Sequence, residues 1–304
     1  MDDVAILLQA LPYLRRYRDK VFVVKVGGEI ARTPEALDLF AGDVAMLNQL
    51  GIRIIVIHGG GPQLDAVSDK MGVKPEKIAG RRITDDATLE MAKMVFAGSI
   101  NTDILAAIRK HGVMPVGLSG LDGEVLSATR RPPKEVTDPD TGEKHTVDFK
   151  NVGDISDCNP ALLRTLVENR YVPVLSPLAC DADGRILNIN ADTVACSVAA
   201  EMQAEKLFIL SNTNGVLKDI EDPESRYVYL TVSRTLELIE KREVRSGMVP
   251  KLQGVIEAVR GGVKRAYLIN GLTPHSLLTE VFTLKGKGTM IIDDAAEQDY
   301  LERG

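Results

Sequence analysis

The chain has 304 residues, of which 44% are hydrophobic, 26% charged and 4% aromatic, and none is tryptophan. This composition excludes general disorder, and the length allows one large domain or two lobes that share a core. The formal net charge of −6 leaves no positive excess for a phosphate backbone, so we expect no nucleic-acid partner.

The N-terminal segment from Asp3 to Lys20 predicts a helix, which Pro12 would kink or split. Its apolar stripe at helical spacing consists of Val4, Leu7, Leu8, Leu11 and Leu14. Two acidic residues follow Met1 where a signal peptide needs basic ones, and no apolar run approaches the roughly 18 residues of a membrane span. We therefore expect a cytoplasmic protein without a membrane partner.

Short apolar runs then alternate with longer amphipathic stretches. The runs are rich in Val, Ile and Leu and predict buried parallel strands over Val21–Val26, Ile52–Ile57, Pro115–Leu118, Val172–Pro177, Lys206–Leu210 and Arg265–Ile269. The stretches have apolar residues three and four apart and predict helices over Thr33–Gly51, Gln63–Met71, Asp86–His111, Asn159–Asn169, Ala191–Ala204 and Pro250–Gly261. This alternation predicts an α/β fold, a three-layer α/β/α sandwich with a mainly parallel central sheet.

Local chemistry marks several boundaries of these elements. Thr33 and Asn159 each precede a proline and can cap helices whose first residue is that proline. The polar stretch Ala128–Asp148 contains two turn signals and predicts an exposed β-hairpin or loop. A second polar insertion, Lys218–Tyr227, follows a predicted strand, where it would edge a binding cleft.

Two of the predicted strands run into glycines. The first carries Lys25 just before Gly27-Gly28, and the second continues through His58 into Gly59-Gly60-Gly61. Such glycines let backbone N–H groups approach an anion, which favours a phosphoryl site over ordinary tight turns, although neither P-loop nor dinucleotide spacing is present. Lys25 would face that anion or extend its ammonium group to solvent at the sheet edge. We expect His58 to be structural, with its ring bonded to a loop carbonyl.

Two further groups of polar residues lie at predicted helix starts. In the segment Asn188-Ile189-Asn190-Ala191-Asp192, the two asparagines would point to the same face if the chain is extended. Asp192 then falls at a helix start, where it is either a simple cap or a functional carboxylate. Lys251 also lies at a helix start, where a cation is unfavourable unless an anion compensates for it. That position favours a ligand phosphate near Lys251.

Eight motifs follow one another in order over nearly the whole chain. They are VVKVGG at Val23–Gly28, IHGGGPQLD at Ile57–Asp65, GRRITD at Gly80–Asp85, VGLSG.DG at Val116–Gly123, VGDIS..NPALL at Val152–Leu163, NINAD at Asn188–Asp192, SGMVPK at Ser246–Lys251 and GTMI at Gly288–Ile291. Together they resemble the amino acid kinase family, and within it the enzymes that phosphorylate the γ-carboxylate of N-acetyl-L-glutamate with ATP. The resemblance implies the α/β/α fold of that family and a place in arginine biosynthesis.

The resemblance also implies roles for individual residues. Lys25 and Lys251 would bracket the transferring phosphoryl group, while Asp192 holds both lysines in position. The substrate-binding residues would be Gly60, Gly61, Arg82 and Asn188. Phosphate and ATP would be bound by Gly27, Gly28, Ser211, Asn212, Gly215 and Met248.

The implied reaction needs no general base, because the substrate carboxylate is the nucleophile and is already ionised. Mg²⁺ would be bound through the ATP phosphates rather than by a metal site of the protein. Cys158, Cys180 and Cys196 agree with this expectation, since they lack metal-ligand spacing and are odd in number for disulfides.

Several positions depart from the family's motifs. Ser99, Thr102 and Leu121 replace lysines of the family, and Asn212 stands where the family has aspartate. Fewer cations around a site for two anions should lower affinity. The alternatives are a kinase for a related acyl amino acid, such as an N-modified 2-aminoadipate, or a weakly active protein that senses arginine or an acyl amino acid.

The N-terminal helix points to regulation. Arginine-inhibited members of the family interlace such a helix between dimers to form a hexamer, so the resemblance implies a homo-oligomer, either a dimer or a hexamer. The inhibitor L-arginine would contact Tyr13, His275, Glu280 and Gly288, with the Glu280 carboxylate facing the guanidinium. The expected organisation is an oligomerisation helix over residues 1–20, an acyl-amino-acid lobe over 21–178 and an ATP lobe over 179–304.

Overall fold

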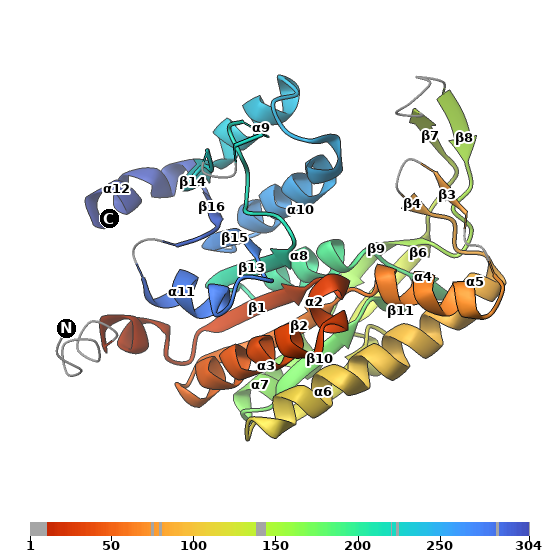
Figure 1. Cartoon of the computed structure of the whole chain (residues 1–304), viewed down its shortest axis with the longest axis horizontal. Helices are drawn as coiled ribbons and strands as arrows, with labels where there is room; N and C mark the ends of the chain where they lie inside the picture. Colours follow the sequence, from red (N-terminus) through yellow and green to blue (C-terminus); the bar gives the residue numbers. More distant parts are fainter. Residues whose placement is uncertain are drawn as a thin grey trace.

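An eight-stranded sheet crosses the molecule in the order β14-β16-β15-β13-β1-β2-β10-β5 (Figure 1). The computed structural model describes residues 11–73, 76–78, 81–137, 144–219, 221–222, 225–283 and 286–303. The strands of the sheet are β1 (Val21–Val26), β2 (Arg53–His58), β5 (Pro115–Ser119), β10 (Val172–Ser176), β13 (Lys206–Ser211), β14 (Tyr229–Thr231), β15 (Arg265–Asn270) and β16 (Thr289–Ile292). Neighbouring strands pair in parallel, apart from β15 with β16, which confirms the predicted sheet.

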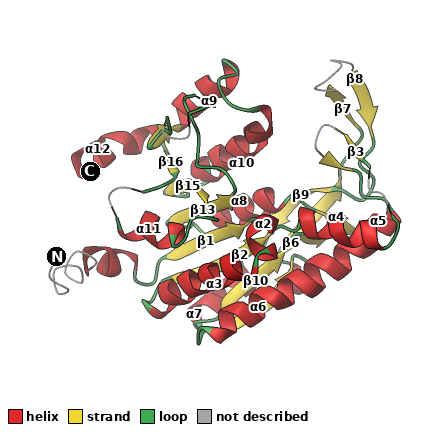
Figure 2. Cartoon of the chain, viewed as in Figure 1, coloured by secondary structure: helices red, strands yellow, loops and turns green. Residues whose placement is uncertain are grey.

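Helices cover both faces of this sheet and complete the predicted three-layer sandwich (Figure 2). Side chains of β1 alternate between the faces, so Phe22 and Val24 enter one core and Val23 enters the other. The core around Phe22 includes residues of α3 (Pro34–Gln49), α4 (Gly61–Lys70), α6 (Asn101–Lys110) and α11 (Ser276–Phe282). The core around Val23 includes residues of α7 (Ala161–Glu168), α8 (Ala191–Glu201), α9 (Val232–Glu240) and α10 (Val249–Arg260).

A second sheet has four strands in the order β12-β11-β6-β9. These are β6 (Leu126–Arg130), β9 (Gly153–Cys158), β11 (Leu178–Cys180) and β12 (Ile186–Asn188). Strand β11 spans the lobe boundary that we expect after residue 178, and it pairs with β12. The division into two lobes stays a prediction.

Two small hairpins extend from the body of the molecule, at the upper right of Figure 1. One consists of β7 (Lys134–Thr137) and β8 (Lys144–Val147), and the other of β3 (Lys77–Ile78) and β4 (Arg81–Arg82). The first lies within the polar stretch Ala128–Asp148 and confirms the β-hairpin predicted there.

The predicted helix Asp86–His111 forms as a continuous segment of α5 (Asp86–Ala92), a π-helical stretch (Lys93–Ile100) and α6. By length and composition alone this segment could cross a membrane, because its mean hydropathy reaches 1.2. This finding corrects the expectation that no apolar stretch approaches the length of a membrane span. Val95, Phe96 and Ile104 are nevertheless buried in the core of the sandwich. Packing against the sheet therefore accounts for its apolar composition.

The helix starts differ in detail from the predicted caps. Helix α3 begins at Pro34 as expected, but the Thr33 side chain makes no capping hydrogen bond within the described part of the chain. Helix α7 begins at Ala161, one residue later than predicted, and Asn159 Oδ1 accepts a hydrogen bond from the Ala161 N–H at 3.1 Å. The α-helices α2 (Gly28–Arg32), α9, α11 and α12 (Glu297–Arg303) were not predicted.

The end of the N-terminal segment belongs to the core. Residues 11–17 are helical, whereas residues 1–10, which carry most of the predicted apolar stripe, lie outside the described structure. Tyr17 is 2% exposed, and its ring centroid lies 5.3 Å from that of Phe22. The Lys206 ammonium group lies 4.7 Å from the Tyr17 ring.

Candidate active site

Three charged side chains from different elements meet at the carboxyl end of β1. Lys25 comes from β1, Asp192 from the first turn of α8 and Lys251 from the first turn of α10. The Asp192 carboxylate is 2.9 Å from Nζ of Lys25 and 2.5 Å from Nζ of Lys251. The side chain of Lys25 is 10% exposed, that of Asp192 20% and that of Lys251 18%. Two ammonium groups and one carboxylate leave a partly buried positive charge, which attracts a phosphoryl group.

The two lysines determine the protonation state of Asp192. Burial alone would raise the pKa of Asp192, but the charges and hydrogen bonds of Lys25 and Lys251 hold that pKa well below its usual range. The carboxylate therefore stays ionised at neutral pH. Because Lys25 pairs with Asp192, the alternative of a lysine extended into solvent is wrong. The same carboxylate is the anion that offsets Lys251 at its helix start.

Asn190, rather than Asp192, caps helix α8. Its Oδ1 accepts hydrogen bonds from the N–H groups of Asp192 at 2.8 Å and Thr193 at 3.2 Å. The interpretation of Asp192 as a simple cap is therefore wrong, and its carboxylate is left to face the lysines. Asn188 takes no part in this cap, because its Nδ2 donates to Oγ1 of Thr84 at 3.2 Å. Its role in binding substrate stays a prediction.

The two glycine turns approach each other closely. A Cβ atom on Gly28 would lie 2.8 Å from Pro62 and 3.2 Å from Cα of Gly60, so a larger residue would push the turns apart. A Cβ atom on Gly61 would meet no atom of the described residues within 4 Å. Helix α4 begins at Gly61, which places the positive end of its dipole at this opening. Backbone N–H groups can bind an anion there.

Gln63 ties the two turns together. Its Nε2 donates to the Gly28 carbonyl at 2.8 Å, while its Oε1 is buried without a hydrogen-bond partner among the described residues. Gly27, the residue before Gly28, occupies the N-cap position of α2. Sequence reasoning missed Gln63, because nothing in a helix-start glutamine indicates that its amide reaches a turn formed by a distant strand.

Arg82 lies beside the second glycine turn with part of its guanidinium unpaired. Its Nη2 donates to Asp65 Oδ1 at 2.6 Å and to the Gly61 carbonyl at 3.3 Å. Its Nη1 is buried and has no hydrogen-bond partner among the described residues. A buried donor without a partner is costly, and a carboxylate suits a guanidinium donor best. Sequence reasoning also missed Asp65, which holds this guanidinium in place.

Apart from Gly27 and Gly28, the residues expected at the nucleotide lie between the end of β13 and the start of α10. Ser211 ends β13, and Asn212 is exposed on the loop that follows. Gly215 has φ +86°, and a Cβ atom there would lie 2.5 Å from Oγ1 of Thr289, so close packing accounts for this glycine without a ligand. Met248 packs at the edge of the core beside α10. The ATP-binding role of these four residues stays a prediction.

Comparison with known proteins identifies the family of this chain. Residues 20–270 match the model of the amino acid kinase family. The chain belongs to this family. Acetylglutamate kinase from Methanothermobacter thermautotrophicus is 42% identical over 293 residues, which cover 96% of this chain and 100% of that protein. Acetylglutamate kinase from Methanocaldococcus jannaschii is 41% identical over 294 residues, 97% of each protein.

Among solved structures, this member of the amino acid kinase family is similar to N-acetylglutamate synthase from Neisseria gonorrhoeae, determined in complex with coenzyme A and N-acetyl-glutamate. The TM-score is 0.80 at 30% identity. The match covers 97% of this chain but 64% of the synthase chain, so this chain spans under two thirds of that protein.

Two of the residues expected to bind arginine lie on or beside helix α11 of this kinase-family fold. Tyr13 packs edge-on against Phe282, with ring centroids 6.4 Å apart. Glu280 is buried, and its Oε2 accepts a hydrogen bond from the Gly288 N–H at 3.0 Å. Lys285, in the loop before Gly288, lies outside the described residues.

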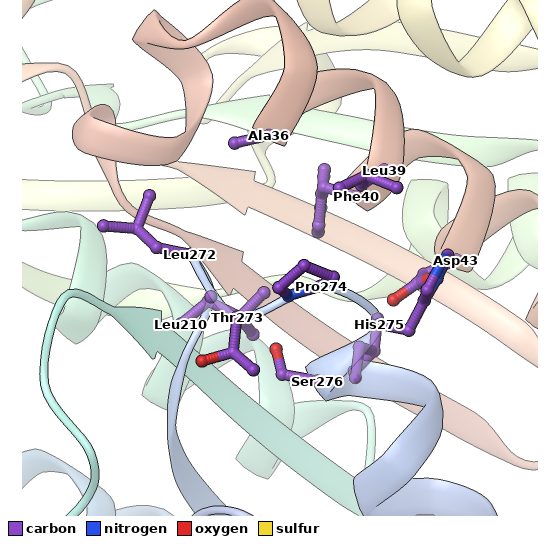
Figure 3. Close-up of a pocket in the computed structure, with 12 residues that line it drawn as sticks. Ala36, Leu39, Phe40, Asp43, Leu210, Leu272, Thr273, Pro274, His275 and Ser276 are labelled. Carbon is purple, nitrogen blue, oxygen red and sulfur yellow. The ribbon is translucent and has the colours of Figure 1, made fainter.

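His275 contacts a different element. Its Nδ1 lies 2.7 Å from Oδ1 of Asp43, a buried residue of α3. Figure 3 shows both side chains at a small pocket between α3 and the start of α11, which Leu272 and Pro274 also line. His275 thus links two helices, and its proposed role in arginine binding stays a prediction.

The positions that lack the family's lysines have structural roles here. Ser99 Oγ donates to the Val95 carbonyl at 3.2 Å, and Thr102 Oγ1 donates to the Gly98 carbonyl at 2.8 Å, so both hydroxyls bond to their own helix. Leu121 packs against the core. Whether these changes weaken ATP binding stays a prediction.

Proposed function

We propose that this chain is an acetylglutamate kinase, which transfers the γ-phosphoryl group of ATP to the γ-carboxylate of N-acetyl-L-glutamate in arginine biosynthesis. Similarity to curated acetylglutamate kinases at 41% and 42% identity over nearly the full length supports this substrate. The structural observation that supports the chemistry is the Lys25, Asp192 and Lys251 cluster.

In this proposal the protein positions two anions and offsets their charge. The attacking carboxylate is ionised at neutral pH, so no side chain has to remove a proton. Lys25 and Lys251 supply positive charge from two elements, and Asp192 fixes both ammonium groups at one point. Because Asp192 stays ionised, it orients the lysines and does not exchange protons with substrate.

The acyl amino acid would lie between this cluster and Arg82. The unpaired Nη1 of Arg82 would bind the α-carboxylate, which would complete the buried guanidinium. The N–H groups of Gly60 and Gly61 would bind oxygens of the transferring phosphoryl group or of the attacking carboxylate. The γ-carboxylate would then face Lys25.

Mg²⁺ would enter the site on the ATP phosphates. Among the described residues, no group of three or more His, Cys, Asp or Glu side chains is arranged to hold a metal ion. The phosphate oxygens themselves suit this hard cation, which neutralises part of their charge when bound.

L-Arginine would act as a feedback inhibitor near α11, in a homo-oligomer of the hexameric type. Burial raises the pKa of Glu280, although the hydrogen bond from Gly288 opposes this effect. A guanidinium beside the carboxylate would favour its ionised form. Tyr13 would couple this site to the N-terminal segment.

A coupled assay for ADP release over a panel of acyl amino acids tests the proposed reaction. We expect turnover with N-acetyl-L-glutamate and much slower turnover with N-acetyl-L-2-aminoadipate, whose extra methylene displaces its terminal carboxylate from Lys25. Faster turnover of the aminoadipate compound would change the proposed substrate. No turnover with any compound, despite ATP binding in calorimetry, would contradict the kinase proposal and favour a sensing protein.

A further inference from the structure

His58 is a buried residue at the end of β2 that the proposed reaction does not use. His58 is 0% exposed and directly precedes the second glycine turn in the chain. Its Nδ1 is 3.2 Å from the carbonyl oxygen of the next residue, Gly59. Its Nε2 is 3.3 Å from Nδ2 of Asn101, which also donates to the Val174 carbonyl at 2.9 Å.

These contacts determine which ring nitrogen carries the proton. A carbonyl oxygen can only accept a hydrogen bond, so the Asn101 atom that lies 2.9 Å from the Val174 oxygen is the amide nitrogen. That nitrogen donates its second hydrogen to Nε2, which must therefore be an acceptor. The proton of the neutral ring is left on Nδ1, which donates to the Gly59 carbonyl. Burial lowers the pKa of His58 to about 4, and the charge of Lys25 acts in the same direction, so the ring is neutral near pH 7.

The hydrogen bond from His58 fixes the peptide that joins Gly59 to Gly60. The described residues contain no cis peptide bond, so the Gly60 N–H points opposite to the Gly59 carbonyl. The Gly59 N–H donates to the Val26 carbonyl at 3.0 Å, and the Gly60 carbonyl accepts from the Leu64 N–H at 2.9 Å. Neighbouring groups on both sides are thus fixed, while the Gly60 N–H has no hydrogen-bond partner among the described residues.

Gly59, at the start of this peptide, lies beside the charged cluster. A Cβ atom on Gly59 would be 3.8 Å from Cε of Lys25 and 3.8 Å from Cβ of Ala191, the residue before Asp192. Glycine lacks the side chain that would otherwise restrict this peptide, so a bond to its carbonyl is needed to hold one orientation. A rotation of the peptide would exchange the free N–H for a carbonyl oxygen, which would repel an anion.

We propose that His58 is a positioning residue, which holds the Gly59 carbonyl so that the Gly60 N–H faces the transferring phosphoryl group or the attacking carboxylate. This inference rests on the proposed kinase function. It assigns His58 no contact with substrate and no proton transfer. Through this contact His58 orients the Gly60 N–H before the anions bind, and such preorganised donors are effective in catalysis.

Two amide substitutions separate positioning from simple packing. In His58→Asn the amide nitrogen can occupy the place of Nδ1 and donate to Gly59. In His58→Gln the amide reaches the place of Nε2, where its oxygen can accept from Asn101, and the Gly59 carbonyl is left without a donor. Both variants put a neutral amide at a buried site, and they differ by one methylene. Ser68→Ala is the matched control. Ser68 is a buried residue of α4 whose hydroxyl donates to the carbonyl of Leu64, also in α4, at 2.7 Å, so its hydrogen bond does not involve the glycine turn.

Steady-state kinetics with N-acetyl-L-glutamate and ATP provide the first readout. We expect His58→Asn to keep kcat within about threefold of the parent, and His58→Gln to lose at least about tenfold in kcat with little change in either KM, because the N–H is used mainly in the transition state. Ser68→Ala should keep kcat even if its Tm falls. Equal kcat values for the two His58 variants, or losses that follow Tm across all three, would overturn the proposal.

Nitrogen-15 NMR of the parent protein provides a second readout that needs no turnover. We expect His58 to carry its proton on Nδ1, and the Gly60 amide signal to shift in His58→Gln but not in Ser68→Ala. A proton on Nε2 would overturn the positioning proposal even in an active enzyme. If the parent protein turns over no acyl amino acid, the kinase proposal fails, and these signals alone decide whether His58 fixes the turn.

Discussion

Asp192 lets two ammonium groups share one partly buried position. Both Lys25 and Lys251 contact the Asp192 carboxylate, and their ammonium groups would repel each other without it. The arrangement tolerates loss of Lys251 better than loss of Asp192, because the remaining Lys25 and Asp192 form a neutral pair. A lysine in this position can therefore be tested for catalysis without a large loss of structure.

Substitution Lys251→Ala should reduce kcat about 10³-fold with little change in Tm, because it removes charge that is used mainly in the transition state. The coupled ADP assay and thermal unfolding measure the two effects. Lys241→Ala is the matched control, since Lys241 is an exposed lysine at the end of α9 and pairs with Glu237 of that helix. An unchanged kcat in Lys251→Ala would remove this lysine from the mechanism.

At the scale of the element, the turn between β2 and α4 combines two kinds of glycine. Gly60 is enclosed, because a Cβ atom there would lie 2.3 Å from Cδ1 of Ile100 and 2.8 Å from Cε1 of Phe96. Gly61 has open space around the corresponding position. Packing therefore explains the first glycine, whereas no packing contact explains the second, for which we propose the close approach of a ligand.

The substitutions Gly60→Ala and Gly61→Ala should consequently behave differently. Gly60→Ala should cost about 1–3 kcal/mol of unfolding free energy through overpacking against Ile100 and Phe96, and activity should fall with it. Gly61→Ala should leave stability unchanged or raised by up to about 1 kcal/mol, while the KM for N-acetyl-L-glutamate rises because the new methyl group occupies ligand space. Urea unfolding and steady-state kinetics measure both. Parent-like kinetics in Gly61→Ala would show that no ligand approaches this backbone.

At the scale of the whole molecule, one sheet brings distant parts of the chain to a common edge. Strand β1 lies inside the sheet, with β2 on one side and β13 on the other. Lys25 therefore emerges where the first and second halves of the chain meet, and α8 and α10 deliver their charged residues to the same point. In Figure 1 the C-terminal elements, in blue, and the hairpins near β4 lie on opposite sides of this central region.

Deletion of residues 1–10 tests the proposed interlaced N-terminal segment. The cut must stop there, because Tyr17 is buried against Phe22 and its removal would open the core. We expect light scattering to give a hexamer for the full chain and a dimer for the shortened one, with a parent-like Tm for the shortened form. An unchanged mass would contradict the interlacing proposal.

Particular residues show how far the sequence could go. Lys25 was recognised because a charged residue inside an apolar strand is costly unless it has a partner, but that partner could not be identified from spacing. Asp192 was equally consistent with a helix cap until Asn190 was found to satisfy the same N–H groups. Gln63 and Asp65 belong to the motif IHGGGPQLD, but nothing in the motif indicated their partners, since each acts on a residue far away in the chain.

The sequence by itself determined the α/β/α sandwich, the parallel strands and the two glycine turns, because periodicity and backbone chemistry are local properties of the chain. Only the tertiary structure decided which charges pair, which groups surround the ring of His58 and which glycine is enclosed. These features depend on distances between segments that the sheet order brings together. A net charge of −6 therefore coexists with a positive cluster, because the fold, rather than the composition, places Lys25 and Lys251 around one carboxylate.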